Sequence, residues 1–62
     1  MNIRELRLEL GMTQQAFADY FDIPLKTLQR WEYGKTKVPK HTMKMIEKIL
    51  VLEGKLDAKH SD

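Results

Sequence analysis

The chain has 62 residues and a formal net charge of +2, so it makes one small domain, marginal in stability without good packing or a partner. Cysteine is absent, which excludes a disulfide framework and thiolate metal sites and makes a cytoplasmic location the natural expectation. No apolar run approaches the ~18 residues that span a bilayer, and the start lacks the apolar core of a signal peptide, so no membrane contact is expected.

The chain shows no period-two alternation and few β-branched residues, and we therefore predict an all-α fold. The first predicted helix covers residues 2–10. Its apolar face holds Ile3, Leu6 and Leu10. Asn2 can cap the first turn, and Gly11 supplies a stop signal.

Residues 13–34 have the pattern of two short amphipathic helices joined by a tight corner, which is the layout of a helix-turn-helix. Thr13 can cap the first of these helices through its hydroxyl group. The apolar face of this helix holds Phe17, Ala18 and Phe21. Asp22 tolerates a left-handed backbone and Pro24 presets φ for a first helical turn, so the chain is expected to turn between them and restart.

The second helix of the pair, about residues 24–33, is predicted to turn Leu28 and Trp31 inward and to end at Gly34. The residues left to face outward or sideways are Leu25, Lys26, Thr27, Gln29 and Arg30. Lysine, glutamine and arginine carry the donors and acceptors that base edges and phosphates require. The same residues are also common on solvated helix surfaces, so two interpretations stand at this point.

The middle of the chain is basic. Residues 1–23 carry a net charge of −2, residues 24–50 a net charge of +5, and residues 51–62 a net charge of −1. Residues 35–40 lack apolar periodicity and are predicted to form a basic loop, in which Pro39 suits the entry to a further helix. Contact with a polyanion is favoured if these positive charges share one surface.

The last predicted helix runs from about residue 40 to 53 and has an unusually wide apolar arc. One face holds Met43, Ile46 and Leu50, and a neighbouring face holds Met45, Ile49, Leu52 and Leu56. The arc either packs into a groove between the first and third helices or provides a self-association surface. Gly54 is expected to end the helix, which gives a domain over residues 1–54 and a polar C-terminal tail over residues 55–62.

Catalytic and metal chemistry are not indicated. His41 and His60 lie far apart without acidic clusters at ligand spacing. The sequence has no Ser/His/Asp set, no paired catalytic carboxylates and no glycine loop that could cradle a phosphate. We therefore expect no metal, no cofactor and no enzymatic activity.

With these features in place, the chain resembles the DNA-binding domain of the Cro and phage-repressor family, the xenobiotic-response-element type of helix-turn-helix. The resemblance covers residues 2 to about 52. The motifs at the family's spacing are Ile3-Arg4-Glu5-Leu6-Arg7, Gly11-Met12-Thr13-Gln14-Gln15, Ala18, and Trp31-Glu32-Tyr33-Gly34-Lys35 followed by Pro39. The resemblance implies a compact four- to five-helix, lambda-repressor-like domain whose helix over about residues 24–33 enters the major groove.

The resemblance also implies roles for individual residues. Base contacts would come from Leu25, Lys26, Gln29 and Arg30. Contacts with the sugar-phosphate backbone would come from Gln14, Gln15, Tyr33, Lys35, Thr36 and Lys37, and Thr27 would make either kind. Arg7 and Glu32 would form a structural ion pair, and Ala18 would lie where the second and third helices cross closely.

The implied function is a sequence-specific DNA-binding transcriptional regulator, Cro-like or repressor-like, that acts on double-stranded DNA as a homodimer. Its self-association surface would be formed by Met45, Ile49, Leu52 and Leu56. An antitoxin-type autoregulator of a toxin–antitoxin pair is a close alternative. A protein-interaction module that binds a protein partner through Leu8, Leu25 and the wide face of the last helix is an alternative of another class.

Overall fold

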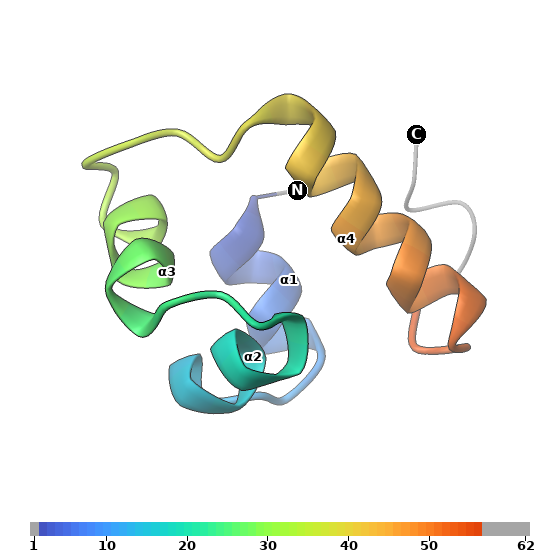
Figure 1. Cartoon of the computed structure of the whole chain (residues 1–62). Coiled ribbons are helices and arrows are strands. Elements are labelled where there is room, and N and C mark those ends of the chain that lie inside the picture. The colour runs from blue at the N-terminus through green and yellow to red at the C-terminus, as the bar shows by residue number, and fades with distance from the viewer. Residues whose placement is uncertain (1, 57–62) are drawn as a thin grey trace.

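The computed structural model describes residues 2–56, which form four helices and no strand. The helices are α1 (Ile3–Glu9), α2 (Gln14–Phe21), α3 (Leu25–Glu32) and α4 (Lys40–Leu52). Figure 1 shows α3 and α4 on opposite sides of α1, with α2 at the foot of the molecule and the loop from α3 to α4 passing over the top. The predicted all-α fold, with a helix-turn-helix formed by α2 and α3, is confirmed.

The helices begin where the sequence signals predict. Asn2 and Glu5 form a reciprocal capping box at the start of α1, in which Asn2 Oδ1 accepts from the Glu5 amide at 2.8 Å. Thr13 Oγ1 accepts from the Ala16 amide at 3.0 Å and caps α2. Helix α3 begins instead after Pro24, whose φ of −57° is already suited to a helical turn.

All four helices end in the same way, with one residue in the left-handed backbone region followed by a reversal of the chain. At the end of α2 this residue is Asp22, with φ 56° and ψ 44°. The Ile23 amide then donates to the Ala18 carbonyl at 2.8 Å, which closes the corner before α3. This local geometry confirms the corner that Asp22 predicts, and it places α3 directly against α2.

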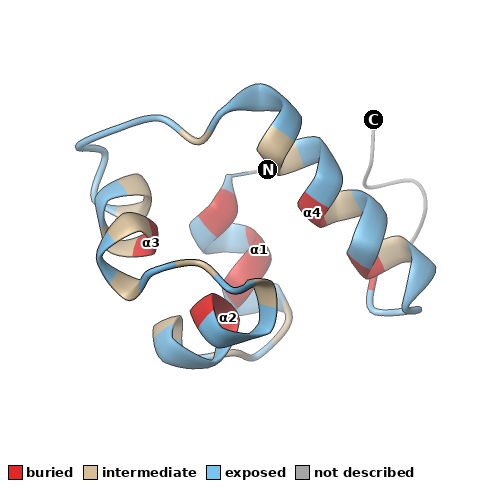
Figure 2. Cartoon of the chain, viewed as in Figure 1, coloured by how far each residue is buried: buried red, intermediate tan, exposed pale blue. Residues whose placement is uncertain are grey.

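The core consists of side chains from all four helices and from the turn after α4. Its members are Ile3, Leu6, Phe17, Ala18, Leu28, Ile46, Leu50 and Leu56. Figure 2 shows these buried positions on the sides of the helices that face one another. Ala18 of α2 is fully buried in this core, so a larger side chain there would have to displace a neighbouring element.

Two residues after Gly54 pack back onto the helices. The left-handed Gly54 reverses the chain, and the amides of Lys55 and Leu56 both donate to the Leu50 carbonyl, at 2.8 and 3.2 Å. Leu56 is thereby returned to the core and is only 9% exposed. Leu56 is therefore not part of an exposed face of α4. Residues 57–62 of the predicted tail lie outside the described residues.

Candidate nucleic-acid interface

Helix α3 presents a polar strip on the side opposite its buried Leu28. Lys26 and Arg30 are exposed and lie one turn apart, which places them on the same side of the helix. Gln29 and Thr27 beside them are half-buried. A helix with exposed cationic side chains beside a half-buried amide can donate hydrogen bonds to base edges and phosphates.

The sequence allows Leu25 to face outward or sideways, and the structure shows the sideways placement. Leu25 is half-buried and packs against the core, because its place in the first turn of α3 brings its side chain within reach of the apolar cluster. Only part of the side chain is left to meet a thymine methyl group or a protein surface. The exposed strip of α3 is consequently mainly polar.

Arg7 and Glu32 connect α1 with the end of α3. Arg7 Nε donates to Glu32 Oε2 at 2.7 Å and Arg7 Nη2 donates to Glu32 Oε1 at 2.8 Å, a two-pronged geometry. The Glu32 side chain is 1% exposed and the Arg7 side chain 11%. Arg7 Nη1 also donates to the Met12 carbonyl at 2.9 Å. A single guanidinium group therefore ties together α1, the segment before α2, and α3.

The electrostatics of this pair keep both groups charged at neutral pH. Hydrogen bonding from Arg7 holds the pKa of Glu32 below its ordinary value, although burial of the carboxylate opposes that shift. The same hydrogen bonds raise the pKa of Arg7. The ion pair is therefore a fixed attachment point for any donor that can reach the remaining lone pairs of Glu32.

Gln14, the first residue of α2, is such a donor. Gln14 Nε2 donates to Glu32 Oε1 at 3.2 Å and lies 3.5 Å from the Tyr33 hydroxyl oxygen. Gln29 Nε2 in turn donates to Gln14 Oε1 at 3.3 Å. The sequence gives no signal of this network, since its members are separated by 15 to 19 residues and meet only when α2 packs on α3.

Gln15 belongs to different surroundings. It is exposed, and its Nε2 donates to Asp19 Oδ1 at 2.9 Å, one turn along the same helix. The two adjacent glutamines at the start of α2 thus have different hydrogen-bond partners. Gln14 is held by α3, whereas Gln15 faces solvent.

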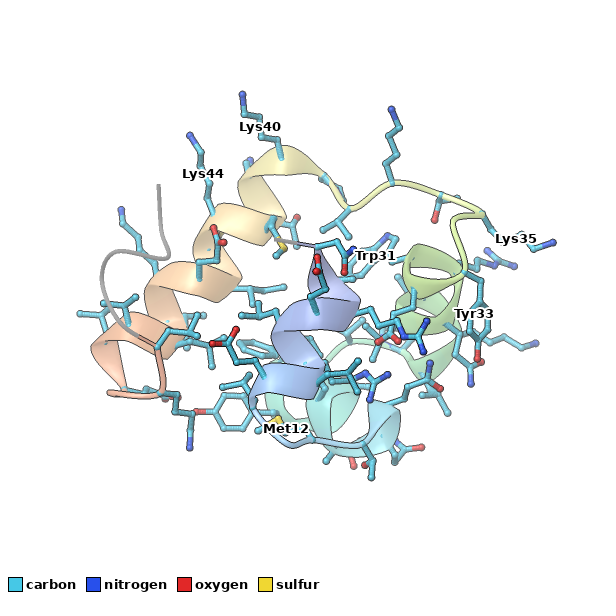
Figure 3. The ribbon with its side chains drawn as sticks, turned by 180° about the vertical axis from the view of Figure 1, so that it is seen from behind. Met12, Trp31, Tyr33, Lys35, Lys40 and Lys44 are labelled. Atoms are coloured by element: carbon cyan, nitrogen blue, oxygen red, sulfur yellow. The ribbon has the colours of Figure 1, made fainter. Side chains whose placement is uncertain are left out.

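The loop after α3 holds the other candidate residues. Tyr33, Lys35, Thr36 and Lys37 are all exposed. The amides of Lys35 and Thr36 donate to the Arg30 carbonyl at 2.9 and 3.4 Å, which fixes the start of the loop to the end of α3. Tyr33 and Lys35 project from the same end of the molecule (Figure 3). This end adjoins the polar strip of α3.

The positive charges of the basic middle are divided between two sides of the molecule. Figure 3 shows Lys35 beside Tyr33 at the end of α3, whereas Lys40 and Lys44 point away from the first turns of α4 in another direction. All three lysines are exposed. The net charge of residues 24–50 is therefore not concentrated on the face that α3 presents.

Within the described residues 2–56, no group of three or more His, Cys, Asp or Glu side chains is arranged to hold a metal ion. None of the four helices of this part has the length and apolarity needed to cross a membrane.

A family model described as helix-turn-helix matches residues 3–50, which covers α1 to α3 and most of α4. No curated protein and no solved structure matches the chain. The matched region contains the α2–α3 corner, the Arg7–Glu32 pair and the loop that follows α3. The chain belongs to the helix-turn-helix family of the Cro and phage-repressor type, a family of DNA-binding domains in transcription regulation.

Proposed function

We propose that this protein is a sequence-specific transcriptional regulator that places α3 in the major groove of DNA. The observation that supports this most directly is the exposed polar strip of α3, which Arg7 and Glu32 hold in a fixed orientation relative to α1 and α2. Side chains assigned to base contacts are Lys26, Gln29 and Arg30, together with the exposed part of Leu25. Arg30 suits guanine, because its guanidinium group can bond two acceptors at once.

We assign contacts with the sugar-phosphate backbone to residues on both sides of that strip. These are Gln14, Gln15, Thr27, Tyr33, Lys35, Thr36 and Lys37. The start of α2 supplies amide groups on one side, and the exposed loop after α3 supplies two lysines on the other. Contacts on both flanks would fix the register of α3 in the groove, while the α3 side chains distinguish the bases.

We further propose that the protein binds DNA as a homodimer through the outward face of α4. Met45, Ile49 and Leu52 are 56%, 37% and 84% exposed, and their spacing of four and three residues forms one apolar stripe. A second copy would cover the same stripe in a two-fold arrangement. Such a dimer would present two α3 helices to half-sites about 34 Å apart on a palindromic operator. Leu56, which the sequence pattern places on the same face, is buried in the core and lies outside this surface.

Selection of bound duplexes from a random DNA pool tests these assignments together. We expect enrichment of one sequence motif, repeated with two-fold symmetry at a spacing of one helical turn. Enrichment of a single unrepeated half-site would contradict the homodimer. Absence of any enrichment would contradict sequence-specific recognition.

The two alternative functions make different predictions. A protein-interaction module would fail to bind duplex DNA even at about 50 mM salt, where phosphate contacts are strong. The half-burial of Leu25 weighs against it, because less apolar surface remains on α3 for a partner. An antitoxin-type autoregulator would also bind DNA, and an adjacent toxin-like reading frame would distinguish it.

A further inference from the structure

We propose that Gln14 determines base preference by orienting Gln29, rather than acting only as a contact to the DNA backbone. The inference rests on the proposed function, because it concerns which bases α3 selects. The inference is based on three hydrogen-bonded pairs, which are Arg7 with Glu32, Glu32 with Gln14, and Gln14 with Gln29.

The buried carboxylate of Glu32 determines which way each side-chain amide in this series of hydrogen bonds points. Glu32 is ionised and can only accept hydrogen bonds, so Gln14 must direct its NH₂ group, and not its carbonyl oxygen, toward Glu32 Oε1. The carbonyl oxygen of Gln14 then points the other way, toward Gln29. Gln29 must donate to this oxygen from its own NH₂ group, which fixes the rotation of the Gln29 amide.

Gln14 has few donors left for DNA. One hydrogen of Gln14 Nε2 is bonded to Glu32 Oε1 at 3.2 Å, and the other is directed to the Tyr33 hydroxyl at 3.5 Å. A contact between the Gln14 side chain and a phosphate oxygen would have to break one of these bonds. The Tyr33 hydroxyl accepts from Gln14 and keeps its own hydrogen, so Tyr33 is the better phosphate donor of the two.

Gln29 is left with a defined pair of groups. One hydrogen of its Nε2 is bonded to Gln14, so one N–H and the carbonyl oxygen remain for DNA. In the major groove adenine offers the N7 acceptor and the N6 amino donor, which complement this N–H and this carbonyl oxygen. A freely rotating Gln29 could present either end of its amide to a given base edge. The orientation that Gln14 imposes favours adenine at one position of the operator.

The Arg7–Glu32 ion pair keeps the Gln14 and Gln29 amides in this orientation. Arg7 binds both carboxylate oxygens of Glu32, at 2.7 and 2.8 Å, and the Glu32 side chain is 1% exposed. Glu32 therefore cannot rotate away from Gln14 without leaving a buried charge unpaired. Gln14 is a positioning residue in this scheme, and Gln29 is the residue that touches the base.

The test compares base preferences of purified variants by selection from a random DNA pool and by titration of single-base operator variants. We expect Gln14→Ala and Gln29→Ala to lose about tenfold preference at the same base pair, which is the discrimination expected of a good two-bond contact. The double variant should lose no more than Gln29→Ala alone, because both changes remove one interaction. Gln15→Ala changes the exposed neighbour, which is assigned to the DNA backbone, so it should weaken all operator variants equally and leave the base preference unchanged.

Two measurements separate positioning from structural damage. Gln14→Met keeps the length of the side chain without its amide, and it should lose the same preference while its melting temperature stays near that of the wild type. In the free protein, the side-chain amide resonances of Gln29 should shift in Gln14→Ala and stay in place in Gln15→Ala.

The inference is overturned if Gln14→Ala weakens every operator variant equally, as the loss of a phosphate contact would. It is also overturned if Gln14 and Gln29 control different base pairs. Failure of the proposed function gives a separate result, since the wild-type protein itself would then enrich no sequence from the pool.

Discussion

The hydrogen-bond network between α2 and α3 and the outward face of α4 differ in the kind of interaction that each can make. In the α2–α3 network, Gln14, Gln29 and Tyr33 are joined by directional hydrogen bonds that end on the buried carboxylate of Glu32. On α4, Met45 and Leu52 are exposed apolar side chains. Directional bonds fix which groups point outward, whereas an apolar face requires only that some other surface covers it.

This difference separates two components of DNA recognition. The α2–α3 network can set specificity, because a base edge distinguishes a hydrogen-bond donor from an acceptor. The face of α4 can set affinity by joining two copies, because apolar burial has little directional preference. Variants in the two regions should therefore fail in different assays.

The largest expected effect comes from breaking the Arg7–Glu32 ion pair, which anchors the α2–α3 network. Arg7→Ala leaves the buried carboxylate of Glu32 unpaired, and we expect it to lower the free energy of unfolding by about 3–5 kcal/mol. That loss is comparable with the whole stability of a small domain. Urea or thermal denaturation measures it. Arg4→Ala, an exposed arginine in the same helix, is the control and should change little.

If Arg7→Ala does not fold, Arg7→Lys supplies the measurement. Lysine keeps the charge but loses the two-pronged donor, so an intermediate loss is expected. A melting temperature unchanged in either variant would show that the pair does not stabilise the fold.

Acid should weaken the same anchor without a mutation. Pairing with Arg7 lowers the pKa of Glu32 in the folded protein relative to its ordinary value of 4.5. The stability that the pair contributes is therefore fully present above about pH 4.5 and is lost as the pH falls through the lowered pKa. Urea unfolding at a series of pH values measures this loss. The dependence should flatten in Glu32→Gln, and an equally steep dependence in that variant would assign the effect to other carboxylates.

Arg30→Ala should change DNA binding without disturbing the α2–α3 network, because Arg30 is exposed. We expect it to weaken binding by about 1–3 kcal/mol and to relax preference at one base pair. Lys37→Ala, in the loop, should instead weaken all sequences equally and reduce the salt slope by about 1. Binding titrations at several salt concentrations on several operators distinguish the two. Equal effects of both variants on all operators would remove Arg30 from base recognition.

The smallest effect on folding, and a distinct effect on assembly, is expected on α4. Leu52 is 84% exposed, so Leu52→Lys should change the free energy of unfolding of the protomer by no more than about 0.5 kcal/mol. It should nevertheless reduce dimer formation, because a second copy would have to bury the added charge. Sedimentation with and without operator DNA measures the change. Leu8→Lys on α1, where Leu8 is 55% exposed, is the control, and an equal effect there would move the interface away from α4.

Much of the fold follows from short-range patterns in the sequence. Asn2 and Thr13 start helices because their side chains reach amides only three residues ahead. Asp22 and Gly34 end helices because each can adopt a positive φ at little cost. The spacing of Leu28 and of Ile46 with Leu50 predicts their inward faces correctly. The pairing of Arg7 with Glu32 came from resemblance to a family and not from any local pattern.

The tertiary structure decided the features that depend on how the helices pack. Leu25 is drawn against the core, and Leu56 returns to it after the turn at Gly54. Lys35 and Lys40 project from different sides, although they are close in the sequence. The link between Gln14 and Gln29 exists only because α2 and α3 meet.

The sequence by itself therefore determined where each helix begins and ends and which face of each is apolar, because these depend on residues a few positions apart. Only the tertiary structure decided which polar groups of α3 remain free for DNA. The physical reason is that a hydrogen bond between distant residues requires donor and acceptor within about 3 Å of each other, and the packing of the helices alone brings them there.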